Sequence, residues 1–391
     1  MQIRFAARLG AILVAASFAA SAFAAEPVLE RWRSYAGVSW DAAQGKPFAN
    51  SVGAPIAGIH FDTKGRAFVS TPRLVAADAP ATLSILDTRA INGPARLSAF
   101  PSPAANDIHG APATHLRNVL GFHIDRRNGW LWALDQGFVA GEAEAPPGGQ
   151  KIMVIDLESR KTVRVIPLDA VADRKGSFLN DIVVDEARRL AFVSDSGLRS
   201  APRNQAAIIV ADFATGGARR LLDRHPSVLP QAGAKVMAHG EEVWAGKPLV
   251  LGVNGIALSP DAQTLYWTVT SGTHAWAIPT ALLRDPQASD EVLAKAVRDL
   301  GDIGGNTDGI VTGADGTLYI TDVTRNGLAQ YDPRTGTLSL LAAHDGVHWP
   351  DTVTIGPDGD VVFTASHLNR HFAGQVKQGE ERYELWRVKR K

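Results

Sequence analysis

The sequence predicts an all-β protein folded as a six-bladed β-propeller. A strand-turn-strand pattern occurs six times, and its first apolar runs begin at residues 59, 122, 182, 256, 310 and 353. Each run is followed by a polar turn and a second apolar run, as in Ile182–Asp185 and Ala191–Val193. Because a lone hairpin cannot bury its apolar face, the copies must pack against one another. Small sheets repeated along one domain-sized chain are typical of a propeller.

The first 25 residues have the pattern of a signal peptide. Two arginines precede an apolar run, Leu9–Ala20, and the small residues of Ala22–Ala24 form a cleavage motif. That run is short for a membrane span, and no later run reaches the required length. We therefore expect a periplasmic or secreted protein without a membrane span, in which residues 26–391 form a single propeller domain.

The third repeat shows most completely the four strands expected of a blade. They are predicted at residues 180–185, 190–194, 206–212 and 218–222, from apolar runs separated by polar turns. Hairpin turns elsewhere contain Asp-Gly pairs, in which glycine supplies the positive φ that such turns need.

Four further segments lie outside the repeated hairpins. Residues 27–34 and 383–388 are both strand-like, and we expect them to share one blade and close the ring. An insertion at 225–247 is rich in Pro, Gly and Ala, whereas the one at 280–300 has the apolar spacing of a helix.

The composition excludes several classes of function. Lys and Arg total 40 and Asp and Glu total 40, so there is no broad positive surface for nucleic acid. The chain has no cysteine, which excludes disulfides, thiolate metal ligands and a cysteine nucleophile. We expect a monomer whose partner is a small molecule.

The residue two positions before each repeat is expected to point at the tunnel mouth, because the inner strands of a propeller converge on its axis. These six residues are Ala57, Leu120, Asn180, Asn254, Asp308 and Asp351. The last four carry oxygen donors of the kind that Ca²⁺ prefers, so they form a candidate calcium site. The alternative is that they cap strand starts and bind one another through water.

The second strands end at the same face with Asp195 and Asp322, which are candidates for ligand binding or for hydrogen bonds to neighbouring backbone. His348, Trp349 and His367 also fall near the mouth, where they either contact a ligand or pack the rim. His60 and His123 occupy matched positions inside inner strands and are expected to pack between blades.

Several stretches resemble the major royal jelly protein/yellow family in its bacterial branch. They include Gly129–Gly137, Leu179–Asp185, Ala191–Ser196 and Gly255–Pro260, and they occur in the family's order. The resemblance implies a secreted six-bladed propeller with a ligand pocket at one end of the tunnel. Our leading hypothesis is that this pocket holds a small aromatic or cyclic molecule, which the protein either only binds or also isomerises. Insect relatives include aromatic-amine binders and proteins linked to dopachrome conversion, so the resemblance leaves open whether this chain is an enzyme.

A more distant similarity is to the gluconolactonase/senescence-marker propellers, which hold a catalytic divalent metal. Asn180, Asn254 and Asp308 match three of the family's four ligands, but Ala57 stands where a glutamate is expected. The alternative function is therefore a calcium-dependent lactone hydrolase in which Asp181 or His367 transfers the proton. A third possibility is a protein-interaction platform that uses the insertion at 225–247.

Overall fold

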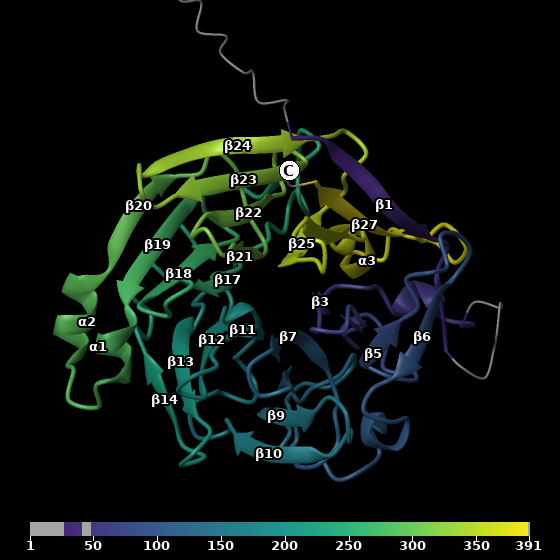
Figure 1. Cartoon of the computed structure of the whole chain (residues 1–391), viewed down its shortest axis with the longest axis horizontal. Helices are drawn as coiled ribbons and strands as arrows, with labels where there is room; N and C mark the ends of the chain where they lie inside the picture. The colour runs from purple at the N-terminus through teal and green to yellow at the C-terminus, as the bar shows by residue number, and fades with distance from the viewer. Residues whose placement is uncertain (1–26, 41–47, 390–391) are drawn as a thin grey trace, which may run out of the picture.

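The computed structural model describes residues 27–40 and 48–389, and the predicted signal peptide with its cleavage motif lies outside these residues. The described chain forms a ring of six antiparallel sheets around a central axis, which confirms the predicted six-bladed propeller. Figure 1 looks along this axis, and the strand that begins each of the six repeats is innermost in its sheet.

The blades follow one another in chain order, and their strands are as follows. Blade one contains β2 (Val38–Trp40), β3 (Ile59–Phe61), β4 (Ala67–Ser70), β5 (Leu83–Leu86) and β6 (Ala95–Ala99). Blade two contains β7 (Val119–Asp125), β8 (Trp130–Asp135), β9 (Lys151–Asp156) and β10 (Thr162–Pro167). Blade three contains β11 (Leu179–Asp185), β12 (Leu190–Asp195), β13 (Ala207–Asp212) and β14 (Ala218–Leu221).

The second half of the ring repeats this plan. Blade four contains β17 (Val253–Leu258), β18 (Thr264–Val269), β19 (His274–Pro279) and β20 (Arg298–Asp302). Blade five contains β21 (Ile310–Thr312), β22 (Leu318–Asp322), β23 (Gly327–Asp332) and β24 (Thr337–Ala343). Blade six contains β25 (Pro350–Ile355), β26 (Val361–Ala365), β27 (Tyr383–Val388) and β1 (Leu29–Tyr35).

The ring closes through blade six, as predicted. β1 pairs antiparallel with β27, with Leu29 opposite Val388 and Tyr35 opposite Tyr383. In Figure 1 this pairing places the purple start of the described chain beside its yellow end. β2 was not predicted: it adds a fifth, parallel strand to the outer edge of blade one.

The hydrophobic core is divided among the interfaces between blades. One cluster joins Phe68 and Leu83 of blade one to Phe122 of blade two, and equivalent clusters occupy the other interfaces. Each sheet thereby buries both faces against its neighbours, which is why a chain of this length needs no single central core.

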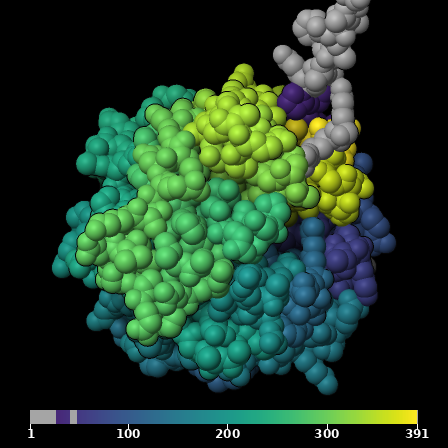
Figure 2. All heavy atoms as spheres, turned by 60° about the vertical axis from the view of Figure 1, so that its left-hand side comes forward, coloured from purple at the N-terminus to yellow at the C-terminus, as the bar shows by residue number. Residues whose placement is uncertain are grey.

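The two insertions lie on different parts of the molecule. The segment at 280–300 forms α1 (Thr280–Arg284) and α2 (Asp290–Ala296), but its last residues belong to β20 and not to a helix. Figure 2 is turned so that the side with α1 and α2 comes forward. The green residues of blades four and five cover a continuous part of the surface there. The earlier insertion contains the short strands β15 (Met237–Ala238) and β16 (Glu241–Glu242) and extends over the axis.

Short helical segments complete the described chain. They are the 3₁₀ turns η2 (Ser51–Gly53), η3 (Ala104–Asn106) and η4 (Leu198–Ser200), and the helix α3 (Leu368–Phe372). Among the described residues no helix has the length and apolar character needed to cross a membrane.

Candidate functional site

The four predicted oxygen donors do converge at one end of the axis. Asn180, Asn254, Asp308 and Asp351 line a common chamber of about 60 Å³, together with Leu120 from the equivalent position of blade two. Ala57, the sixth equivalent residue, lies in an apolar cluster with Leu120 and Trp349. We call this space the mouth chamber. The strand phase predicted from the repeats is therefore correct at this end of the tunnel.

Local strand irregularities help to aim these residues inward. The pairing register shifts near the start of β11, β17 and β25, the strands that carry Asn180, Asn254 and Asp351. Such a bulge bends the strand and re-aims its side chains. The register shifts therefore help to turn the side chains of Asn180, Asn254 and Asp351 toward the mouth chamber.

Asp308 is the best-anchored donor of the mouth chamber. Its Oδ2 accepts a hydrogen bond from the indole Nε1 of Trp349 at 2.6 Å, and its Oδ1 accepts one from Nδ2 of Asn254. Asn254 Nδ2 also donates to the hydroxyl of Thr270 at 2.7 Å. These contacts leave the amide oxygen of Asn254 available to a ligand, because its nitrogen makes both described bonds.

Burial makes the ionised form of these carboxyls costly. It raises the pKa of Asp308 to about 7, although the bonds from Trp349 and Asn254 act in the opposite direction. Burial, with the negative charges of Asp308 and Asp181, raises the pKa of Asp351 well above its ordinary value. Burial therefore favours the protonated form of Asp351, Asp308 is partly ionised at neutral pH, and a bound cation would favour ionisation of both.

The mouth chamber is roofed by apolar and aromatic side chains. Trp244 and Trp349 line it from above, with Leu198, Leu249, Leu251, Leu368 and Phe372 around them. Trp244, Leu249 and Leu251 belong to residues 236–251, which we call the lid. The lid covers the mouth and buries Val236, Ala238 and Val243 against the axis.

Hydrogen bonds hold the lid to three blades or their connections. The indole Nε1 of Trp244 donates to the carbonyl of Asn369 at 2.9 Å, and the backbone N–H of Met237 donates to Oδ1 of Asn306 at 3.0 Å. The ring Nε2 of His239 lies 2.9 Å from the carbonyl of Val347. These hydrogen bonds therefore hold the lid in a defined position over the mouth chamber.

A larger hollow of about 550 Å³ lies between the lid and α3. Trp244, Trp349 and Asn369 line both this hollow and the mouth chamber, so they form the partition between the two. We call the outer hollow the vestibule. Its charged lining consists of Glu241, Glu242 and Arg370.

Three histidines stack along one wall of the vestibule. The ring centroid of His348 lies 4.1 Å from that of His239 and 4.2 Å from that of His367, with the rings nearly parallel. Burial and the neighbouring positive groups lower the pKa of His348 to about 4 and that of His367 to about 3, so both are neutral at pH 7. The predicted rim residues therefore present flat neutral rings to the vestibule.

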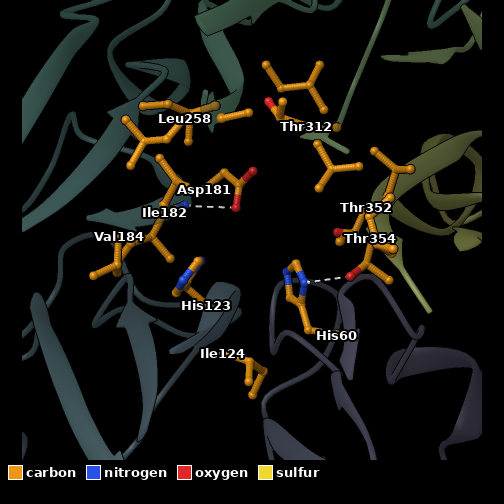
Figure 3. A pocket seen from close by; sticks show the side chains of 18 of the residues that line it. His60, His123, Ile124, Asp181, Ile182, Val184, Leu258, Thr312, Thr352 and Thr354 are labelled. Carbon is orange, nitrogen blue, oxygen red and sulfur yellow. Dashed lines mark hydrogen bonds between the residues drawn. The ribbon is translucent and has the colours of Figure 1, made fainter. Parts of the chain in front are cut away.

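Asp181 lies on the other side of a narrow waist in the tunnel. Gly121 and Gly309 stand at this waist, where an added Cβ would lie 2.5 Å from the carbonyl oxygens of Asn180 and Asp351, respectively. Only glycine permits the inner strands to approach so closely. Asp181 faces a separate chamber of about 260 Å³ at the far end of the axis (Figure 3). Its carboxylate and His367 therefore line different cavities.

Asp195 and Asp322 have structural partners away from both chambers. Oδ2 of Asp195 accepts hydrogen bonds from Arg220 at 2.7 Å and from the hydroxyl of Ser177, and its other oxygen accepts the N–H of Phe178. Asp322 accepts two bonds from Arg325, one from its backbone N–H and one from its guanidinium. Of the two interpretations of these aspartates, the structure favours hydrogen bonding to neighbouring backbone.

The donor set of the mouth chamber suits calcium only with the help of amide oxygens. In residues 27–40 and 48–389 no group of three or more His, Cys, Asp or Glu side chains is placed to hold a metal. Asp308 and Asp351 would have to be joined by the side-chain oxygens of Asn180 and Asn254, a set of hard ligands compatible with Ca²⁺.

Two features of the site were not predicted from the sequence. Trp244 lies in an insertion without periodicity, so nothing in its neighbourhood indicated that it covers the axis. His60 and His123 do pack between blades, since His60 meets Phe122 edge to face, but both also line the far chamber. Their matched positions in two inner strands were the signal that could have indicated a place on the tunnel wall.

Comparisons with known proteins agree with this architecture. Residues 118–390 match the family described as Major royal jelly protein. No curated protein matches the chain. The solved structure of a luciferin-regenerating enzyme is similar with a TM-score of 0.50 and 12% identity, over 93% of this chain and 95% of that one. A gluconolactonase from Xanthomonas campestris has a TM-score of 0.49 and 16% identity, over 86% of each chain. Identities this low show similarity of fold alone.

Proposed function

This chain belongs to the major royal jelly protein family, and we propose that it binds a small aromatic or cyclic organic molecule at the tunnel mouth through a protonated amine. The observation that carries the proposal is the pair Asp308 and Asp351. Both line one small chamber whose described lining contains no lysine, arginine or histidine. A cation from outside the chain would supply the missing positive charge.

The volumes of the mouth chamber and the vestibule suit different parts of the proposed ligand. A chamber of about 60 Å³ has room for an ammonium group or an ion with a few water molecules, but not for a ring. The vestibule of about 550 Å³ has room for the ring. The ammonium group would lie between the carboxylates, and the ring would pack against Trp244, Trp349 and the stacked histidines. Binding therefore requires the indole partition to shift.

The same pair of carboxyls has the properties of a proton-transfer couple. Burial favours the protonated form of Asp351, which can donate a proton, and the ionised fraction of Asp308 at neutral pH can accept one. This arrangement suits an isomerisation that moves a proton between two atoms of a bound ligand. Isomerisation is thus the reaction class that we propose for this site, and export of the protein remains a prediction from residues 1–25.

A calcium-dependent lactone hydrolase is the second candidate, because the mouth chamber has the size of an ion site. Asn180, Asn254, Asp308 and Asp351 would hold the ion, which when bound would polarise a substrate carbonyl. Asp181 faces the far chamber and His367 the vestibule. Of the two residues suggested for the proton, His367 is therefore the one on the substrate's side of the waist.

Titration of the protein with 2-phenylethylamine by calorimetry tests the amine proposal. We expect Asp308→Asn to weaken binding at least tenfold, about 1.4 kcal/mol, while Glu291→Gln, at an exposed carboxylate of α2, leaves it unchanged. The neutral analogue 2-phenylethanol should not bind at this site. Equal amine binding by Asp308→Asn would refute the proposal. Calcium binding that depends on Asp308, without any amine binding, would favour the hydrolase.

A further inference from the structure

The far chamber leaves apolar side chains uncovered at the axis. It is lined by residues from all six inner strands, and its aliphatic members include Ile182, Val184, Ile256, Leu258, Ile310 and Ile355. Leu258 and Ile355 are only half-buried, although they point toward the centre of the protein. Figure 3 shows the side chains arranged around an open space. A concave, mainly apolar surface of this kind is typical of a small-molecule site.

A few polar groups converge on the same space. The carboxylate of Asp181 lies at its inner end, where it accepts hydrogen bonds from the backbone N–H of Ile182 at 2.8 Å and from that of Ile256. Burial is the main reason that its pKa is raised to about 7. The hydroxyl oxygen of Thr312 is buried and has no partner among the described residues. The chamber thus offers one strong acceptor, the carboxylate of Asp181, at its inner end.

His60 is neutral at pH 7 and brings no charge into this chamber. Burial, together with His123 and Arg126, lowers the pKa of His60 to about 3, and its Nδ1 lies 3.2 Å from the hydroxyl of Thr354. His123 is paired with Glu186 at 3.3 Å. Arg126 is exposed and donates to the carbonyls of Phe61 and Ile355. Charge is therefore confined to the outer rim and, in its ionised form, to Asp181.

Size and polarity restrict what the chamber can hold. Its volume of about 260 Å³ exceeds the roughly 150 Å³ that accommodates benzene in a protein core. A sugar or other polyol would leave hydroxyls unpaired against the aliphatic wall, at a substantial cost. An anion would meet the carboxylate of Asp181, and a cation would meet the guanidinium of Arg126 at the rim. The remaining class is a neutral single-ring molecule with one or two hydrogen-bonding groups.

We propose that the far chamber is a second binding site, separate from the mouth, for a neutral monocyclic molecule that carries a hydroxyl group, of the phenol class. The hydroxyl donates a hydrogen bond to the carboxylate of Asp181, and the ring packs against Ile182, Ile256 and the other aliphatic side chains. This site does not depend on a cation or on the lid.

Fluorine NMR with 4-fluorophenol as the probe tests the site. We expect the probe to bind the parent protein, and its affinity to fall at least tenfold in Val184→Phe, which enlarges a buried side chain of the chamber wall, and severalfold in Asp181→Asn, which weakens the acceptor. Glu291→Gln, at an exposed carboxylate of α2, serves as the control and should bind the probe as the parent does. Circular dichroism of each variant shows whether the fold is retained, and Asp181→Asn keeps the test decisive if Val184→Phe does not fold.

Two related probes define the ligand class. 4-Fluoroanisole has nearly the same shape but no hydroxyl hydrogen, and we expect it to bind at least fivefold more weakly than 4-fluorophenol. 4-Fluorobenzylamine should not compete for the far chamber. Absence of phenol binding, equal binding of the anisole, or preferential binding of the amine to this chamber would each overturn the proposal. Loss of the phenol in Asp308→Asn, but not in Asp181→Asn, would place it at the mouth instead. None of these outcomes depends on whether amines bind at the mouth.

Discussion

The indole nitrogen of Trp349 donates a hydrogen bond to Oδ2 of Asp308 across 2.6 Å, and the backbone of Trp349 has a φ of +56°. A left-handed conformation is unfavourable for a bulky residue, by about 1 kcal/mol or more. The surrounding structure holds this conformation, which places the indole over the mouth chamber. Trp349 is therefore both part of the partition between the mouth chamber and the vestibule and a hydrogen-bond donor to Asp308.

Trp349→Phe should weaken cation binding at the mouth while preserving the apolar roof. Without the indole N–H, the pKa of Asp308 rises further, so less of it is ionised at pH 7. We expect affinity for 2-phenylethylamine to fall about five- to tenfold and the pH midpoint of binding, near 7 in the parent, to move upward. Calorimetric titrations between pH 6 and 8.5 measure both. Trp276→Phe, on β19, is the matched control, and an unchanged midpoint in Trp349→Phe would contradict the role assigned to the indole.

Asp351→Asn should stabilise the ligand-free protein in a pH-dependent way. The pKa of Asp351 is higher in the folded than in the unfolded state, so at pH values between the two the folded protein retains a proton that the unfolded chain releases. Stability from this group is present at low pH and is lost as pH rises. We expect the free energy of unfolding of the variant to exceed that of the parent at pH 8 and to match it near pH 4, close to the pKa of an unfolded aspartate.

Urea unfolding at the two pH values measures this difference. A gain of the same size at pH 4 and pH 8 would show that the substitution acts through packing and not through the charge of Asp351. Addition of the amine at pH 8 should reduce the advantage of the variant, because the ligand stabilises only a protein that retains the carboxylate.

Trp244→Phe should loosen the lid. The change removes the hydrogen bond from the indole to the carbonyl of Asn369 while keeping an aromatic ring against Leu249 and Leu251. A bond of this kind contributes about 1 kcal/mol, so opening of the lid should become about fivefold more frequent. In stopped-flow measurements, amine association and dissociation should both accelerate, with little change in affinity. Unaltered rates would show that ligands reach the mouth chamber without movement of Trp244.

Most of the fold was predictable from local pattern. The six strand-turn-strand copies predict the blades, and the strand-like residues at both ends predict closure, which the pairing of β1 with β27 confirms. This worked because each hairpin carries its own alternation of apolar and polar residues. Residues 298–300 were expected to be helical, as the end of the second insertion, but they belong to β20 and pair with β19. The hydrogen bonds to a neighbouring strand outweigh a weak helical preference.

The sequence by itself determined the blades and the phase that places Asn180, Asn254, Asp308 and Asp351 at one end of the axis, because equivalent positions of a repeat occupy equivalent places in the ring. Tertiary structure alone decided that Asp181, one residue further along β11, faces a different chamber. The glycines of neighbouring inner strands draw the backbones together there and divide the tunnel. It also decided that Trp244 roofs the mouth. An insertion without periodicity takes its position from the surface it covers, and that surface exists only once six blades have packed into a ring.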